Sequence, residues 1–218
     1  MRHFIHELDE LQNRLLEMGG LVESSIHESV LALTDRRVRL TENVWSNETR
    51  INRLEIEIDE LAIRLLALQQ PIAGDLRFIA AAIKINTDLE RMGDLAVNIA
   101  QRAFALIEKP GADVPVDIHR MAMLAQAMVR KCLDAFVRRD PDLAREVLLS
   151  DDEVDRLRTS IYRESIEFMK QDPTTIVEGV DLILISRHLE RIADHATNIA
   201  EGTLFLVKGI DVRHHAEA

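Results

Sequence analysis

The sequence predicts an all-α fold of two tandem antiparallel three-helix bundles that are related by pseudo-twofold symmetry. Three observations predict it: the composition, the spacing of helix-breaking residues, and an internal repeat. Of 218 residues, 47% are hydrophobic but only 4% are aromatic. This excess of aliphatic over aromatic side chains favours helices over sheets. Five prolines and eight glycines leave room for long helices.

Breakers and caps divide the chain into six predicted helices. Pro71 separates the second from the third, and both Asp140–Pro141 and Asp172–Pro173 are a capping residue followed by a first-turn proline. Gly209 is positioned to end the last helix. The predicted helices span about 4–33, 35–68, 75–107, 116–138, 141–169 and 173–208.

The segment 110–116 is the one predicted linker, because it contains Pro110, Gly111 and Pro115. We therefore expect one three-helix domain at 1–109 and a second at 117–218. Gly19 and Gly20 interrupt the first helix, at a cost of roughly 1 kcal/mol each relative to alanine. Such a pair could mark a kink or a place where a partner approaches closely. The preferred interpretation is a locally bent helix in which the pair has no role.

A repeat joins the two predicted halves. DLERMGDLAVNIAQRAFAL begins at Asp88 and HLERIADHATNIAEGTLFL begins at His188, an offset of 100 residues. A duplicated core needs only apolar side chains at matching positions, so repeated polar identities suggest duplicated chemistry. A fainter repeat relates Glu48–Ile58 to Asp151–Ile161 at an offset of 103. The identities of the first repeat are Leu89, Glu90, Arg91, Asp94, Asn98, Ile99 and Ala100, each with its counterpart 100 residues later.

Each repeated helix carries a stripe of apolar residues with alternating spacings of three and four, as in a helical bundle. The first stripe is Ile85, Leu89, Met92, Ala96, Ile99 and Ala103, and the second is Ile185, Leu189, Ile192, Ala196, Ile199 and Thr203. Polar residues one turn apart lie on the opposite face. They are Glu90, Asp94 and Asn98 in the first half and Glu190, Asp194 and Asn198 in the second.

The preceding helix of each half brings further polar groups to the same height. Glu48 and Asn52 lie 23 and 19 residues before Pro71, whereas Glu90 and Asp94 lie 19 and 23 after it. At 1.5 Å per residue, both sets stand about 30 Å along antiparallel neighbours. Asp151 and Asp155 take the corresponding place before the turn at Pro173.

Carboxylates stacked one turn apart repel each other, at a cost of about 0.2–0.5 kcal/mol per pair, and a bound cation would reverse that cost. Oxygen ligands without thiolates suit Mg²⁺, Mn²⁺, Ca²⁺ or iron, whereas zinc usually takes more His or Cys. His188 and His195 could add nitrogen in the second half. The alternative is a solvated acidic face paired with Arg91, Arg187 and Arg191.

Several functional classes are disfavoured. The net charge of −11 argues against nucleic acid and against a basic membrane-binding face, and favours cations or basic protein surfaces as partners. No apolar run approaches the ~18 residues of a spanning helix, and the charged N-terminus does not resemble a signal peptide, so we expect a cytoplasmic protein. Cys132 lies in an apolar helical stretch and is predicted to be a buried thiol. No Ser/His/Asp arrangement, phosphate-cradling glycine loop or di-iron ExxH signature supports catalysis.

The QQPIAGDLR turn, the two LER helices and the closing VKGIDVRH together resemble the PhoU family of phosphate-signalling proteins over nearly the whole length. This resemblance implies a cytoplasmic, non-enzymatic, metal-binding repressor of the phosphate-starvation response. It also implies two partners, the ATPase subunit of the phosphate ABC transporter and a sensor histidine kinase, with membrane association only through them. A metal-dependent phosphohydrolase and a metal-free helical scaffold are the alternatives, and the long amphipathic surfaces suggest a homodimer.

The family's metal motif, E(D)xxxD, implies divalent or trivalent ions such as iron, Mn, Mg or Zn, including multinuclear clusters. It matches Glu90 with Asp94, Glu190 with Asp194, and Asp151 with Asp155, but Glu48 is followed by Asn52. The first half therefore lacks one carboxylate of the pattern.

We predict weaker metal binding in the first half, because Asn52 removes a negative charge. E90A/D94A and E190A/D194A variants should then lose unequal amounts of metal, with the larger loss in the second variant. Elemental analysis of both purified variants checks this, and equal losses would contradict the asymmetry.

Overall fold

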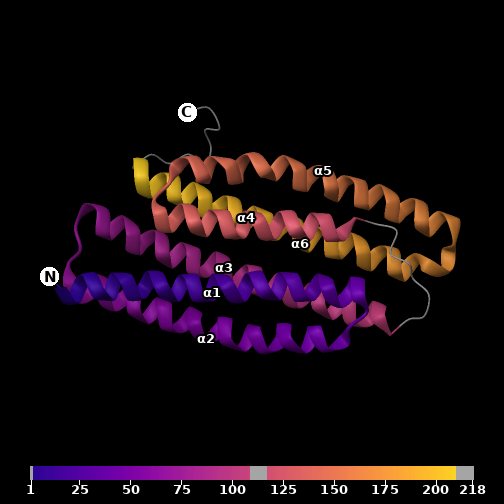
Figure 1. Ribbon diagram of the computed structural model, residues 1–218, viewed down its shortest axis with the longest axis horizontal. Helices are drawn as coiled ribbons and strands as arrows, with labels where there is room; N and C mark the ends of the chain where they lie inside the picture. The colour runs from indigo at the N-terminus through magenta and orange to yellow at the C-terminus, as the bar shows by residue number, and fades with distance from the viewer. Residues whose placement is uncertain (1, 109–116, 210–218) are drawn as a thin grey trace.

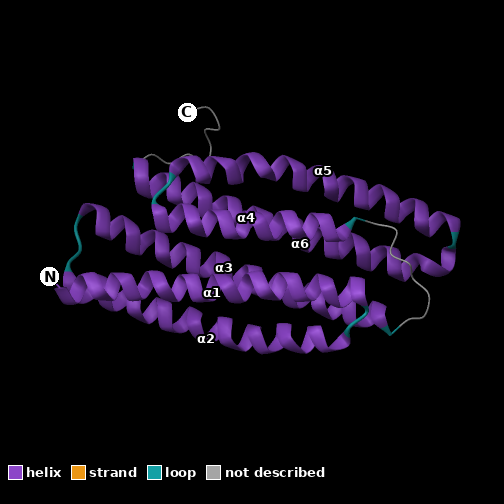
Figure 2. Ribbon diagram, in the orientation of Figure 1, coloured by secondary structure: helices purple, strands orange, loops and turns teal. Residues whose placement is uncertain are grey.

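A computed structural model describes residues 2–108 and 117–209. Within these ranges the chain forms long helices, one short 3₁₀ helix and no strand (Figure 2), which confirms the all-α class. The predicted linker at 110–116 lies outside the described residues, and the proposed domain limits stay predictions. The elements are α1 Arg2–Asp35, α2 Val38–Gln69, α3 Ala73–Ile107, α4 Ile118–Arg138, α5 Pro141–Gln171, η1 Pro173–Thr175 and α6 Ile176–Lys208.

The helices form two bundles that lie side by side (Figure 1). The first bundle packs α1, α2 and α3 together, and the second packs α4, α5 and α6. The halves meet where α3 packs against α6 and α1 against α4, and α3 and α6 run in opposite directions (Figure 1). The two tandem three-helix bundles expected from the sequence are thus present. None of the described helices combines the length and apolar character needed to cross a membrane.

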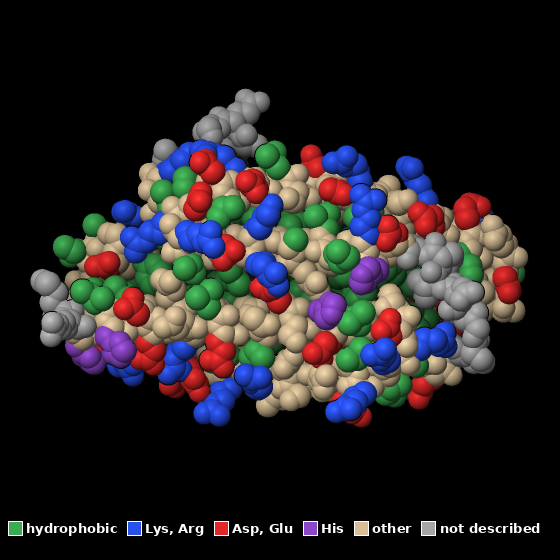
Figure 3. Space-filling view, in the orientation of Figure 1, with side chains coloured by type: hydrophobic (Ala, Val, Ile, Leu, Met, Phe, Trp, Pro, Cys, Tyr) green, Lys and Arg blue, Asp and Glu red, His purple; other side chains and the backbone are tan. Residues whose placement is uncertain are grey.

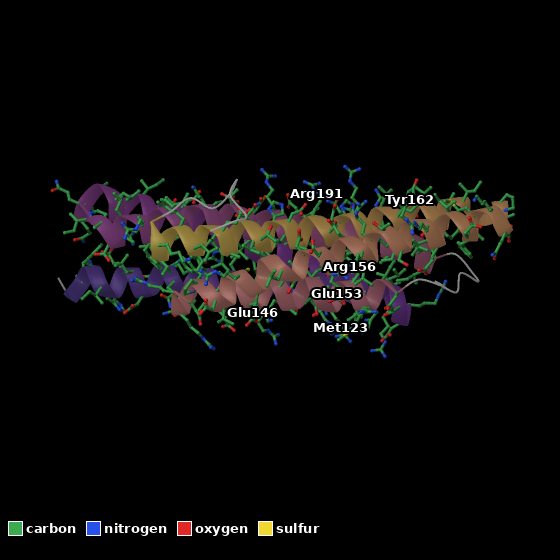
Figure 4. The ribbon with its side chains drawn as sticks, turned by 90° about the horizontal axis from the view of Figure 1, so that it is seen from above. Met123, Glu146, Glu153, Arg156, Tyr162 and Arg191 are labelled. Atoms are coloured by element: carbon green, nitrogen blue, oxygen red, sulfur yellow. The ribbon has the colours of Figure 1, made fainter. Side chains whose placement is uncertain are left out.

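The molecule seen edge-on has α6 on one side and α4 on the other (Figure 4). Arg191 points outward from the α6 side, whereas Met123 lies on the α4 side. The labelled residues of α5 climb from the α4 side at Glu146 to the α6 side at Tyr162. Figure 3 shows the α4 side of the molecule face-on. On this face, which is formed largely by α1 and α4, acidic and basic side chains are interspersed.

The predicted caps are observed with one difference. The Asp140 carboxylate accepts hydrogen bonds from the backbone N–H groups of Asp142 (2.9 Å) and Leu143 (3.1 Å), and Pro141 begins α5. Asp172 likewise accepts from the backbone N–H of Thr174 at 2.9 Å, but it caps η1 rather than a longer helix. The α-helix α6 therefore begins at Ile176, three residues after the predicted start.

The apolar stripes predicted on α3 and α6 form the core. All twelve stripe residues are buried, including Thr203, whose hydroxyl donates a hydrogen bond to the Ile199 carbonyl at 3.0 Å. Cys132 is fully buried and burial raises the pKa of its thiol, so it does not act as a reactive cysteine.

The two halves are joined by polar and aromatic contacts as well as by the core. Across the α3–α6 seam, Arg102 Nη1 lies 2.9 Å from Asp181 Oδ1, and His195 Nδ1 lies 2.8 Å from Asp88 Oδ1. Phe78 of α3 stacks on Phe136 of α4 with ring centroids 5.2 Å apart. These contacts fix α3 relative to the second bundle.

Gly19 has a role in packing. This differs from the preferred prediction of a locally bent helix in which the glycine pair has no role. α1 is a single helix through Gly19 and Gly20. A Cβ atom on Gly19 would overlap the Leu133 side chain of α4, whereas a Cβ on Gly20 would meet nothing within 4 Å. The absence of a side chain at Gly19 lets the two bundles approach closely. The close approach at Gly19 is therefore made by α4 of the same chain.

The Gly19→Ala substitution should destabilise the protein by about 1–3 kcal/mol, because Leu133 must move to relieve the overlap. The matched control, Gly20→Ala, should stabilise it by up to about 1 kcal/mol through helix propensity alone. Urea unfolding followed by circular dichroism measures both. Equal effects of the two substitutions would show that α1 and α4 do not need the close approach.

Candidate metal centre

In the second half, the predicted carboxylates of α5 and α6 face one another. Burial, followed in order of influence by the negative charges of Asp194, Asp155, Asp152 and Glu190, raises the pKa of Asp151 to about 6. The structure therefore brings both predicted acids of α5 close to both predicted acids of α6. Their shared field disfavours the ionised form of Asp151.

The other acids of this cluster respond to the same environment. Burial raises the pKa of Glu190, and the charge of Asp194 is the next cause. Burial also raises the pKa of Asp194, and there the charge of Asp155 is the next cause. Arg158 partly offsets this repulsion, because its Nε lies 3.4 Å from Glu190 Oε1 and 3.9 Å from Asp155 Oδ1. One guanidinium thus faces several carboxylates.

In the first half, the centre of the cluster is Glu90. Its side chain is only 17% exposed, and burial raises its pKa, followed by the charge of Asp94. Arg91 lowers the same pKa, with its Nε 3.4 Å from Glu90 Oε2. The i,i+3 pair that the solvated-face alternative predicts is present but long, since Arg91 Nη1 lies 4.0 Å from Asp94 Oδ2.

Glu48 and Asn52 of α2 stand at the predicted height. A Cβ atom on Gly93 would lie 3.1 Å from Ile51 Cδ1, so this turn of α2 is level with the Glu90–Asp94 turn of α3. Asn52 is exposed and Glu48 is half-buried. Glu48 is not among the groups that most strongly shift the pKa of Glu90, so the structure brings this pair to the right level but less close than its counterpart on α5.

The carboxylate of α2 that does reach Glu90 is Glu55, which raises its pKa. Glu55 is not part of the predicted set, because in the repeat with offset 103 it corresponds to Arg158, a residue of opposite charge. The buried Asn86 of α3 holds this part of α2 in place. Its Nδ2 donates hydrogen bonds to the Glu55 carbonyl and to Asp59 Oδ1, both at 2.9 Å.

The two predicted asparagines and the nearby histidines take different positions. Asn98 is half-buried on α3, whereas Asn198 Nδ2 donates to Asp88 Oδ1 across the seam at 3.4 Å. His195 uses its Nδ1 on the same oxygen. Burial and then the charges of Arg102, Arg191 and Arg187 lower the pKa of His188 to about 4. His188 thus faces arginines and not the acids.

The chemistry of both clusters suits a hard cation, since their donors are carboxylate oxygens. The pKa values of Asp151, Glu190 and Asp194 are raised first by burial and then by neighbouring negative charge, both of which a bound cation would offset. In the part of the chain that the structure describes, no three His, Cys, Asp or Glu side chains are arranged to enclose an ion. The donor type therefore fits a metal, and any binding site would need side chains of these clusters to turn inward.

The fold and these paired acidic helices define a helical repeat protein in which each half carries the same kind of acidic helix pair. A family model described as the PhoU domain matches residues 15–103 and again residues 118–203. The chain therefore belongs to the PhoU family.

Curated relatives and solved structures agree with this assignment. The chain is 42% identical to a phosphate-specific transport system accessory protein PhoU homolog of Pseudomonas aeruginosa, covering 98% of this chain and 88% of the relative. It is 40% identical to the Aquifex aeolicus homolog, covering 95% and 94%. A crystal structure of PhoU from Pseudomonas aeruginosa superposes with a TM-score of 0.90 at 41% identity, covering 95% of this chain and all of that one. The phosphate transport system regulatory protein PhoU from Streptococcus pneumoniae gives 0.87 at 31% identity, covering 96% and 99%.

The acidic cluster predicts a specific pH dependence. The pKa of Asp151 rises from an ordinary 3.8 to about 6 on folding. Between these values the folded chain binds more protons than the unfolded one, so the free energy of unfolding falls as pH rises. The Asp151→Asn substitution should remove this loss and stabilise the metal-free protein at pH 7, by about 1 kcal/mol after solvent screening.

Urea unfolding between pH 4 and pH 7, with chelator present, measures this effect. Glu164→Gln, an exposed change on the same helix, is the control and should leave the pH dependence as in the wild type. An Asp151→Asn protein with wild-type stability at pH 7 would show that the carboxylates do not repel one another in the folded state.

Proposed function

We propose that this chain is a non-enzymatic, metal-binding negative regulator of phosphate uptake and of the phosphate-starvation response. It acts in the cytoplasm between the phosphate ABC transporter and its sensor histidine kinase. Support for the phosphate role comes from the relatives, which are named as accessory or regulatory proteins of phosphate transport. Family membership across both halves supports carrying that role to this chain.

The observation that supports metal binding best is that burial, followed by the negative charges of neighbouring acids of this cluster, raises the pKa values of Asp151, Glu190 and Asp194. A cation held by these groups supplies the positive charge that Arg158 provides only in part. Glu55, Glu90 and Asp94 form the corresponding donor group in the first half, with Glu48 at its edge. Glu55 contributes a carboxylate that the sequence pattern did not include, but three acids then converge in the first half where four converge in the second, which agrees with weaker metal binding in the first half.

These residues would couple metal binding to the relative position of helices. Asp151 and Asp155 belong to α5, whereas Glu190 and Asp194 belong to α6, so a shared ion joins the two helices. The pair α2–α3 is joined in the same way. Metal loading would thus hold the acidic surfaces in the form that the transporter ATPase subunit and the kinase bind, with a homodimer as the assembled unit.

The test compares Glu190→Gln/Asp194→Asn with a control of equal charge change, Glu164→Gln/Glu167→Gln, at exposed positions of α5. We expect the cluster variant to bind Mn²⁺ or iron at least about tenfold more weakly and to lose co-purification with transporter and kinase. The control should keep both. Equilibrium dialysis with elemental analysis, followed by pull-down from cells carrying both partners, measures this.

Three outcomes would overturn the proposal. Metal binding that is unchanged in the cluster variant would remove the assigned ligands. Unchanged partner binding after chelation would favour a metal-free scaffold. Turnover of phosphate esters that the cluster variant loses would make the protein a metal-dependent phosphohydrolase.

A further inference from the structure

A cavity of about 500 Å³ lies between α3 and α6, in the half of the seam formed by the start of α3 and the end of α6. Its wall contains the small residues Ala81 and Gly202 together with Phe205, and its polar residues include Lys84, Asp88 and Glu201. Apart from Asn198, which borders it, none of the candidate metal ligands lines it. The cavity is therefore a separate feature of the seam.

The internal repeat explains why this cavity exists. At the offset of 100 residues, Gly202 corresponds to Arg102 and Ala81 corresponds to Asp181. At the corresponding place on the other side of the pseudo-twofold axis, Arg102 crosses from α3 to α6 and its Nη1 lies 2.9 Å from Asp181 Oδ1. The seam is thus filled by an arginine of this chain at one end and left open at the other.

The open end has room for a side chain. A Cβ atom on Gly202 would meet nothing within 4 Å, so the cavity begins directly at the α6 backbone. Cavities of this size suit small ligands or inserted side chains when apolar walls are combined with a few polar groups. Here the apolar wall can cover the methylene groups of a long side chain.

The charge of the open end favours a cation. Asp88 lies in the wall with its side chain 18% exposed, and it is fixed because its Oδ1 accepts from Asn198 Nδ2 and faces His195 Nδ1. The charged residues in the wall are the carboxylates of Asp88 and Glu201 and the ammonium of Lys84. Lys84 is exposed, so its stem can line the cavity while its charge stays in water.

We propose that this cavity receives an arginine side chain of a partner protein, with the guanidinium on Asp88 and the methylene stem against Ala81, Gly202 and Phe205. The partner reproduces from outside the contact that Arg102 makes from within at the other end of the seam. Arginine suits the place because its planar guanidinium binds carboxylates in a fixed geometry and tolerates partial burial. The chain's net charge of −11 favours approach of a basic surface.

The test is a titration of the full-length, ¹⁵N-labelled protein with N-acetyl-L-arginine amide, with N-acetyl-L-citrulline amide as its neutral counterpart. We expect saturable shifts of the backbone amide signals at residues 80–88 and 198–205 with the arginine probe. Citrulline should bind at least tenfold more weakly, because it has the same shape without the charge. The corresponding lysine amide should also bind more weakly.

Two variants that fill the cavity complete the experiment. Gly202→Arg supplies the side chain from within and Gly202→Leu fills the apolar part without charge, and both should abolish the arginine-dependent shifts. Gly20→Arg, at a second helical glycine with open space around it, should bind the probe as the wild type does. Thermal unfolding of each variant establishes that it is folded, and with two substitutions at Gly202 the test survives the failure of either one to fold.

The proposal fails if the arginine probe causes no shifts around Gly202, or if citrulline or lysine binds as well as arginine. It also fails if both folded Gly202 variants still bind the probe. Binding of the neutral probe alone would make the cavity a site for small uncharged molecules. None of these outcomes affects the metal proposal, because no carboxylate of the acidic clusters is changed.

Discussion

The antiparallel contact between α3 and α6 is the constraint on which the rest of the structure depends. Both helices bury a complete apolar stripe, and each must also serve its own bundle. α3 packs on α1 and α2, and α6 packs on α4 and α5, so only the remaining faces are open to polar chemistry. The acids next to the stripes are therefore held at fixed heights by packing that has nothing to do with charge.

This constraint explains why the carboxylates stay together although they repel one another. Moving the Cα atom of Asp151 or Glu190 away from the cluster would require α5 or α6 to rotate, and rotation would expose apolar side chains whose burial is worth about 1.5–3 kcal/mol each. The repulsion is instead expressed as raised pKa values and as a local demand for positive charge. Arg158 neutralises part of the negative charge in the second half, and Arg91 does so in the first.

Much of this could be predicted from the sequence because it depends on local rules. Asp140–Pro141 specified a helix start, the stripes specified the buried faces, and counting residues from Pro71 and Pro173 placed the acids at matching heights. The remaining features depend on which side chain meets which across helices. Glu55 was missed because its repeat counterpart is Arg158, and the role of Gly19 depends on Leu133, more than a hundred residues away. Asn198 has the same spacing as Asn98, but its amide is directed by Asp88 of the other half.

The pseudo-twofold seam also bears on how such a chain can diverge. A single half would expose the seam face of its last helix, and two identical copies that covered it symmetrically would pair about a true twofold axis. In that pair both ends of the seam would be the same, so an arginine filling one end would fill the other. Joining the copies in one polypeptide removes that requirement. Position 102 can then keep an arginine while position 202 becomes glycine, and one molecule carries both a closed and an open version of the same groove.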